Sequence, residues 1–77
     1  MNVTIQPIGP LRKHLDEGTS TATVNVPKGS TVIDALAAIG ISEDTQWNAS
    51  VNGQLVYRDT AISDQDHLLV FSPIEGG

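Results

Sequence analysis

One segment of the chain has a strong helix signal, and it limits the fold to arrangements in which a short helix packs on a sheet. Thr31 lies three residues before Asp34, the spacing of an acidic variant of the capping box. Val32 and Leu36 follow at helical spacing, and Gly40 stands where a left-handed helix end is expected. The predicted helix has about two and a half turns at 3.6 residues per turn, too short to be stable alone. We therefore expect its apolar stripe to be buried against a sheet.

Strand-like segments lie on both sides of this helix. Five segments have the alternating or β-branched pattern of strands: residues 3–6, 19–26, 47–51, 55–57 and 67–71. The pair Asn52-Gly53 is the strongest kind of short hairpin signal, and it joins the third and fourth segments. Residues 11–17 permit one helical turn, and the acidic residues 63–66 predict a tight turn before the last strand.

The order of these elements predicts an α+β fold, with a mixed sheet of four to five strands and one main helix packed on one face. We expect the first two strands to be antiparallel, because their connection is too short for a crossover helix. The closing strand could lie centrally beside the first, as in a β-grasp, and the residues alone leave that pairing open. We expect a single domain over residues 1–77, with residues 73–77 as an extended, flexible tail.

Size and composition exclude several classes of function. A chain of 77 residues has no room for a deep active-site cleft. It contains no cysteine, which removes disulfides, thiolate metal sites and cysteine nucleophiles. A secreted chain of this length would often need disulfides, and neither a signal-peptide pattern nor an apolar run of about 20 residues is present, so we expect a cytoplasmic location.

The net charge also narrows the choice of partners. The formal charge is −5, with only four lysines and arginines. Nucleic acids and anionic membranes both select a basic patch, so we expect neither as a partner. An acidic surface favours protein partners that are basic where they touch it.

The last predicted strand is apolar on both faces. Leu68 and Val70 point one way and Leu69 and Phe71 the other, whereas a single helix covers only one face of a sheet. Fully burying a Leu or Phe contributes about 1.5–3 kcal/mol, so such side chains are usually covered by something. Either loops bury the second face of the strand, or that face binds a partner.

The partner hypothesis points to particular residues. Ile8 has an even number, whereas the apolar residues Val3 and Ile5 of the first strand have odd numbers, so Ile8 would lie on the opposite face of the sheet. Leu55 and Val56 are neighbours, so one of them must also point away from the helix. A partner-binding face would therefore contain Ile8, Leu55 and Phe71, beside the root of the tail.

Few side chains suggest chemistry of their own. His14 and His67 have no second nitrogen or sulfur ligand at zinc-like spacing, so we expect no metal site. Ser63, Asp64 and His67 are the residue types of a hydrolytic triad, but they lie within one turn and lack a nucleophile elbow, which favours turn and capping roles. The acidic pairs lie in predicted loops and offer too few oxygen ligands for calcium. We expect no bound cofactor.

The sequence as given finishes on Gly76 and Gly77. Because glycine has no Cβ, this backbone can pass through a channel that rejects any side chain. The four residues from Ile74 reach at most about 14 Å. A terminal carboxylate is inert by itself, but it becomes an acyl donor once another enzyme adenylates it. The alternative is a frayed end without a role.

Several segments together resemble the MoaD/ThiS sulfur carriers, which are ubiquitin-like β-grasp proteins. The segments are VNGQLV (51–56), SDQD (63–66), LLVFSPIEGG (68–77), PKGSTVIDAL (27–36) and, closer to the MoaD branch, IGPLRKHL (8–15). Ser72-Pro73 departs from the two prolines that MoaD proteins often have, and Gln65 stands at a turn position that is commonly glycine.

The resemblance implies a carrier and not an enzyme. In that family an E1-like adenylating enzyme uses ATP to activate the last glycine, and a sulfur donor system then replaces AMP to leave a thiocarboxylate. Gly77 would carry the sulfur and Gly76 would give it access. The implied partner contacts are Ile8, Leu55 and Phe71, with Pro73 and Ile74 at the root of the tail.

The two branches of the family deliver sulfur to different acceptors. In the MoaD branch the tail enters the large subunit of molybdopterin synthase, and in the ThiS branch the sulfur supplies the thiazole of thiamine through thiazole synthase. The resemblance favours the molybdopterin synthase small-subunit type. The alternatives are a ThiS-type carrier or one for another sulfur pathway, a protein modifier joined through Gly77 to lysines of target proteins, and an interaction module whose tail is incidental.

Overall fold

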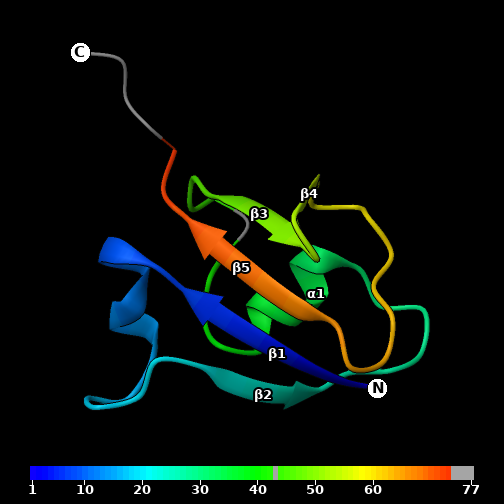
Figure 1. Ribbon diagram of the computed structural model, residues 1–77, viewed down its shortest axis with the longest axis horizontal. Helices are drawn as coiled ribbons and strands as arrows, with labels where there is room; N and C mark the ends of the chain where they lie inside the picture. Colours follow the sequence, from blue (N-terminus) through cyan, green and yellow to red (C-terminus); the bar gives the residue numbers. More distant parts are fainter. Residues whose placement is uncertain (43, 74–77) are drawn as a thin grey trace.

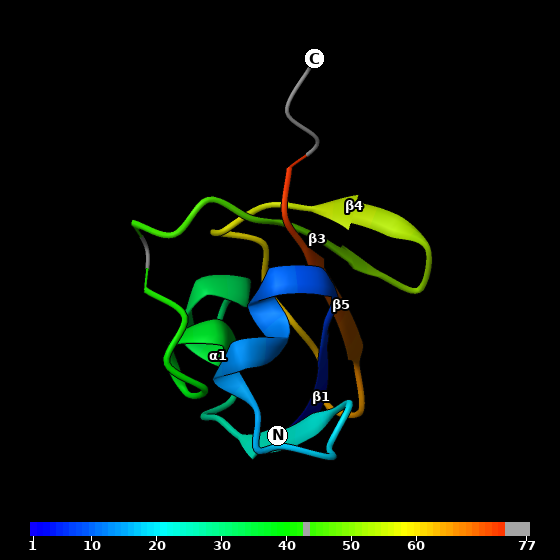
Figure 2. The same cartoon turned by 90° about the vertical axis from the view of Figure 1, so that its left-hand side faces the viewer.

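The computed structural model describes residues 1–42 and 44–73, which form one sheet, one α-helix and one 3-10 helix. The elements are β1 (Asn2–Pro7), η1 (Gly9–His14), β2 (Ala22–Asn25), α1 (Val32–Ala37), β3 (Asn48–Val51), β4 (Gln54–Val56) and β5 (His67–Phe71). The strand order is β2-β1-β5-β3-β4, and α1 lies across one face of the sheet (Figures 1 and 2).

The pairing of the strands gives a mixed sheet. β1 is antiparallel to β2 and parallel to β5, while β3 is antiparallel to both β5 and β4. The expected antiparallel start is therefore confirmed. The pairing that the sequence left open is also settled, because the closing strand lies in the centre beside the first, with Ile5 opposite Leu68. This arrangement is the β-grasp fold, and the α+β expectation is correct.

The core lies between the sheet and α1. Val3 and Ile5 of β1 and Leu68 and Val70 of β5 are fully buried on the helix side. The main buried apolar residues that α1, η1 and the loops add are Val32, Ala35, Leu36, Ile41, Leu11 and Ile62. Each fully buried aliphatic side chain of this size contributes about 1.5–3 kcal/mol, so this layer supplies most of the driving force for folding.

The start of α1 has the predicted chemistry. The Asp34 carboxylate accepts hydrogen bonds from the Thr31 backbone N–H at 2.9 Å and from the Thr31 hydroxyl at 3.0 Å. The Val32 N–H, one of the first donors that lack a partner within the helix, donates to the Thr60 carbonyl at 3.0 Å. The helix start is thus fixed both by its own side chains and by the loop that follows β4.

The end of α1 comes earlier than expected. The regular helix stops at Ala37, because the N–H of Gly40 donates to the Ala37 carbonyl at 3.0 Å and the N–H of Ile41 donates back to the Leu36 carbonyl at 3.1 Å. This pair of bonds is the Schellman pattern, and it requires the left-handed conformation that Gly40 has, with φ +88°. The predicted glycine cap is confirmed, although the helix is only six residues long.

Several other element boundaries differ from expectation by one residue, and the differences are larger at the second strand and at residues 11–17. The second strand begins at Ala22 and not at residue 19, because the Thr19 N–H and hydroxyl both donate to the Asp16 carbonyl in a turn, at 3.1 and 2.6 Å. The helical turn expected at 11–17 is instead the 3-10 helix Gly9–His14, which starts at the Gly-Pro pair. The Asn52-Gly53 hairpin is confirmed, since both residues have positive φ.

The acidic turn before β5 is tied to the start of β1. The Asp64 Oδ1 accepts a hydrogen bond from the Asn2 N–H at 2.7 Å, and the Gln65 N–H donates to the Asn2 carbonyl at 2.7 Å. The Asn2 N–H, with a smaller contribution from the Gln65 side chain, lowers the pKa of Asp64 below its ordinary value of 3.8. Gln65 has φ +71°, which explains why glycine suits this position.

This lowered pKa gives a prediction for the pH dependence of stability. A carboxyl group whose folded pKa is depressed stabilises the fold above its unfolded pKa, and the stabilisation is lost as the pH falls through the folded pKa. We expect Asp64→Asn to lower the free energy of unfolding at pH 7 and to have little effect near pH 2, as measured by urea denaturation. Asp44→Asn, outside this turn, is the control. An equal loss at both pH values would contradict the role of the charge.

Candidate protein-docking surface

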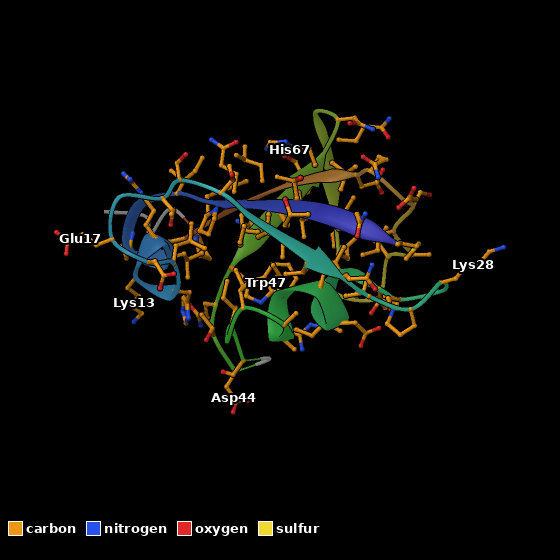
Figure 3. All side chains as sticks on the ribbon, turned by 90° about the horizontal axis from the view of Figure 1, so that it is seen from below. Lys13, Glu17, Lys28, Asp44, Trp47 and His67 are labelled. Atoms are coloured by element: carbon orange, nitrogen blue, oxygen red, sulfur yellow. The ribbon has the colours of Figure 1, made fainter. Side chains whose placement is uncertain are left out.

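Within residues 1–42 and 44–73, no other layer covers the face of the sheet opposite α1 (Figure 2). In Figure 3, His67 lies on this outer face, while Trp47 lies on the helix side of the sheet. The strand register aligns four residues across the outer face, in the order Gln6, Leu69, Ser50 and Leu55. Leu69 is half-buried and Leu55 is 56% exposed, so the small Ser50 leaves an apolar residue accessible on either side of it.

A second group of apolar residues lies at the end of β1 and β5. The Ile8 N–H donates to the Val70 carbonyl at 2.8 Å, which continues the β1–β5 pairing by one residue beyond β1. This bond brings Ile8, 42% exposed, next to Phe71, which is half-buried and pairs with Asn48 of β3. We call Ile8, Leu55, Leu69 and Phe71 the outer patch.

The outer patch has a polar border. His67 Nε2 lies 2.8 Å from Gln6 Oε1, and His67 pairs with Thr4 across the β1–β5 register. Beyond this border the outer face carries polar side chains, such as Thr23 and Asn25 of β2, both exposed. The accessible apolar area is therefore confined to one end of the sheet.

That end is also where the chain leaves the sheet. β1 and β5 run in the same direction and end side by side, and η1 follows at once from β1 (Figure 1). Ser72 and Pro73 are half-buried as the chain leaves β5. Ile74, Gly76 and Gly77 lie outside the described residues, so their predicted roles stay predictions.

The structure clarifies which candidate residues come together. Ile8 and Phe71 are neighbours, whereas Leu55 is separated from β5 by β3 and shares its face with Leu69. Leu55, and not Val56, is the residue that points away from the core.

The alternative that loops bury the second face of the last strand holds only partly. Leu69 and Phe71 are half-buried, while Ile8 and Leu55 stay exposed. Tyr57 is not among the surface candidates identified from the sequence. Its side chain is 65% exposed, and its position two residues after Leu55 would place it on the same face of a strand.

The described residues contain neither a metal-binding cluster nor a membrane-spanning helix. Within residues 1–42 and 44–73, no three His, Asp or Glu side chains gather as a metal site. In the same part of the chain, no helix has the length and apolar character needed to span a membrane. A core on one face of the sheet and an apolar patch on the other describe a small β-grasp protein without a catalytic or metal centre in residues 1–42 and 44–73.

Comparison with known proteins gives the family. The sequence model of the ThiS family matches residues 9–77, and the chain belongs to this family. No curated protein sequence matches the chain. The ThiS family contains small carriers that do not catalyse reactions themselves, so the chain is a carrier and not an enzyme.

Solved structures agree with this assignment. SAMP1 from Haloferax volcanii matches with a TM-score of 0.76 and 25% identity over 100% of both chains. A second crystal structure, of H. volcanii small archaeal modifier protein 1, matches with a TM-score of 0.75 and 24% identity over 95% of this chain and 98% of that one. A putative molybdopterin converting factor subunit 1 from Pyrococcus furiosus matches with a TM-score of 0.72 and 25% identity over the same shares. The resemblance to MoaD/ThiS carriers is confirmed.

The outer patch leads to a prediction about stability. Leu68→Ala and Leu55→Ala remove the same atoms from neighbouring parts of the sheet, but Leu68 is fully buried. We expect Leu68→Ala to lower the free energy of unfolding by about 2–5 kcal/mol, and Leu55→Ala by about 0.5 kcal/mol or less. Urea denaturation followed by circular dichroism compares them. Similar losses for the two variants would mean that Leu55 belongs to the core and not to a free surface.

Proposed function

We propose that the chain is a sulfur carrier of the molybdopterin synthase small-subunit type, with the Gly77 carboxylate as its working group. The observation that carries the proposal is the position of the outer patch beside the end of β5, in a chain whose match to the ThiS family continues to residue 77. The likeness to the P. furiosus converting factor subunit supports this branch of the family.

The proposed chemistry takes place in partner enzymes. In an E1-like adenylating enzyme, a carboxylate oxygen of Gly77 attacks the α-phosphorus of ATP, and pyrophosphate leaves. Hydrosulfide (HS⁻) delivered by a donor system then attacks the acyl carbon, AMP leaves with the electron pair of the broken acyl–oxygen bond, and the sulfur loses its proton. The product is a thiocarboxylate on Gly77. The chain itself binds no cofactor in this scheme, and Gly76 serves only to keep the tail thin enough to enter the partner's site.

In this proposal the outer patch binds the partner protein. Its exposed apolar side chains become buried against the large subunit of molybdopterin synthase, with contributions of about 1.5–3 kcal/mol for each fully buried residue. Pro73 and Ile74 extend the same contact along the root of the tail. Docking at this end of the sheet keeps Gly77 close to the acceptor, so that sulfur transfer becomes effectively intramolecular. We place this exchange in the cytoplasm.

The test of the proposal is the intact mass of the protein. With its cognate activating enzyme, ATP and a sulfur source, the wild-type chain should gain about 16 Da, because sulfur replaces one oxygen. A variant that lacks Gly77, or one with a C-terminal tag, should gain nothing under the same conditions. No gain by the wild type would contradict the proposal. Complementation of molybdenum-cofactor or thiamine auxotrophs then separates the MoaD-type carrier from a ThiS-type carrier.

A second candidate function is protein modification, and the likeness to SAMP1 over the full chain favours it. In this case a lysine amine of a target protein attacks the acyl carbon of the Gly77 adenylate, AMP leaves, the nitrogen loses a proton, and an isopeptide bond forms. Expression in the native host should then give adducts on lysines. A protease that cleaves after Glu75 would leave a Gly-Gly remnant on those lysines, detectable by peptide mass spectrometry, whereas trypsin, whose last site is Arg58, would leave residues 59–77. Adducts that persist after deletion of Gly76 and Gly77 would exclude this function.

A further inference from the structure

A hollow lies at the open edge of the sheet, beside β4. Its volume is about 180 Å³, and its walls come from residues 47–48, just before and at the start of β3, and from residues 55–58 in and after β4. The lining residues are Trp47, Asn48, Leu55, Val56, Tyr57 and Arg58. β4 is the last strand of the sheet, so no further strand from the described part of the chain covers this edge. We call this feature the β4 hollow.

The β4 hollow continues from the outer patch, because Leu55 belongs to both. Its rim carries Tyr57, which at 65% has the largest exposed fraction among the large hydrophobic side chains of the described residues. Arg58, also exposed, stands next to Tyr57. Within residues 1–42 and 44–73, the side-chain hydrogen bonds do not include the Arg58 guanidinium. The exposed side chains of Tyr57 and Arg58 therefore contribute little to the stability of the fold.

The backbone under Tyr57 and Arg58 is nevertheless held firmly. The Tyr57 N–H donates to the Thr60 hydroxyl at 2.9 Å, and the Thr60 N–H donates to the Tyr57 carbonyl at 3.1 Å. The Arg58 carbonyl accepts a bond from the Ile33 N–H of α1 at 3.0 Å. An aromatic residue and an arginine are thus presented on a fixed turn, which lowers the conformational entropy lost when a partner binds.

The chemistry of the rim selects the kind of group that fits. Tyr and Arg are the residue types most enriched at the energetic centres of protein interfaces. The Arg58 guanidinium can bind a carboxylate through two parallel hydrogen bonds, and the neighbouring walls of Leu55, Val56 and Tyr57 suit an apolar side chain. A protein segment with an Asp or Glu next to an apolar residue complements both features.

We propose that the β4 hollow is a second docking site, which binds such an acidic segment of the acceptor protein. This inference rests on the proposed function, because the acceptor is the protein that takes the sulfur from the carrier. The outer patch then supplies apolar contact near the tail, and Arg58 selects the acceptor by charge. The net charge of the carrier is −5, which on average repels an acidic segment, and the Arg58 cation offsets this repulsion at the rim of the hollow.

The test compares two charge reversals in the full chain. Arg58→Glu removes the proposed contact, and Lys28→Glu makes the same change in net charge at an exposed residue that lines a different hollow. Affinity for the large subunit of molybdopterin synthase is measured by calorimetry. We expect Arg58→Glu to weaken binding by about tenfold or more and Lys28→Glu by less than about twofold. Thermal melting of both variants checks that each is folded.

A spectroscopic readout locates the contact independently. Trp47 is the only tryptophan of the chain and lines the β4 hollow, so a carrier labelled with 5-fluorotryptophan gives one ¹⁹F resonance from this site. The unlabelled acceptor should shift this resonance with the wild-type carrier and with Lys28→Glu. The shift should be much smaller with Arg58→Glu or Tyr57→Ala at the same concentration of acceptor.

The outcomes separate the two proposals. If the wild type gains sulfur and binds the acceptor, and Arg58→Glu binds equally well, this inference is wrong and the proposed function stands. If Arg58→Glu impairs only adenylation by the activating enzyme, the hollow serves that enzyme and the inference is again wrong. If the wild type neither gains sulfur nor binds the acceptor, the proposed function fails, and this inference fails with it.

Discussion

The parallel pairing of β1 with β5 is the contact on which the rest of the structure depends. It places Ile5 beside Leu68 on the face that packs on α1, and so builds the centre of the core. Since parallel strands end at the same edge of a sheet, it also brings Ile8 to Phe71 and to the point where the chain leaves β5. If β5 ran antiparallel to β1, the tail would leave at the opposite end, far from the outer patch.

In the part of the chain that the structure describes, no layer covers the outer face of the sheet, and apolar side chains are exposed there. Leu55 and Ile8 expose apolar area to water, which contributes nothing to the stability of the free chain. The same area is available for a partner, and the Gln6–His67 border confines it to the end of the sheet nearest the tail. The charge of the carrier also affects which partners it can bind. The overall charge of −5 favours basic partners, whereas Arg58 at the rim of the β4 hollow favours an acidic group at one point of the contact.

The sequence predicts best what short-range chemistry decides. The Thr31–Asp34 start of the helix, the Gly40 end and the Asn52-Gly53 hairpin depend on residues a few positions apart, and all three are present. The boundaries were less accurate, because the Schellman bonds shorten α1 and a turn at Thr19 delays β2.

Long-range features could be anticipated only in part. The alternation in β5 placed Leu69 and Phe71 on the outer face, but the central position of this strand follows from packing and was left open. The β4 hollow could not be predicted, since it needs the β3–β4 register and the hydrogen bond between Arg58 and Ile33 to bring its walls together. The position of Tyr57 in the wall of the β4 hollow has no signal in the sequence, apart from its spacing of two residues from Leu55.

The alternation of β5 has a consequence for how such carriers diverge. Leu68 and Val70 maintain the core, while Leu69 and Phe71, interleaved with them, face outward. Substitutions at the odd-numbered positions 69 and 71 can therefore change the partner that is bound. The core is kept by the even-numbered positions 68 and 70.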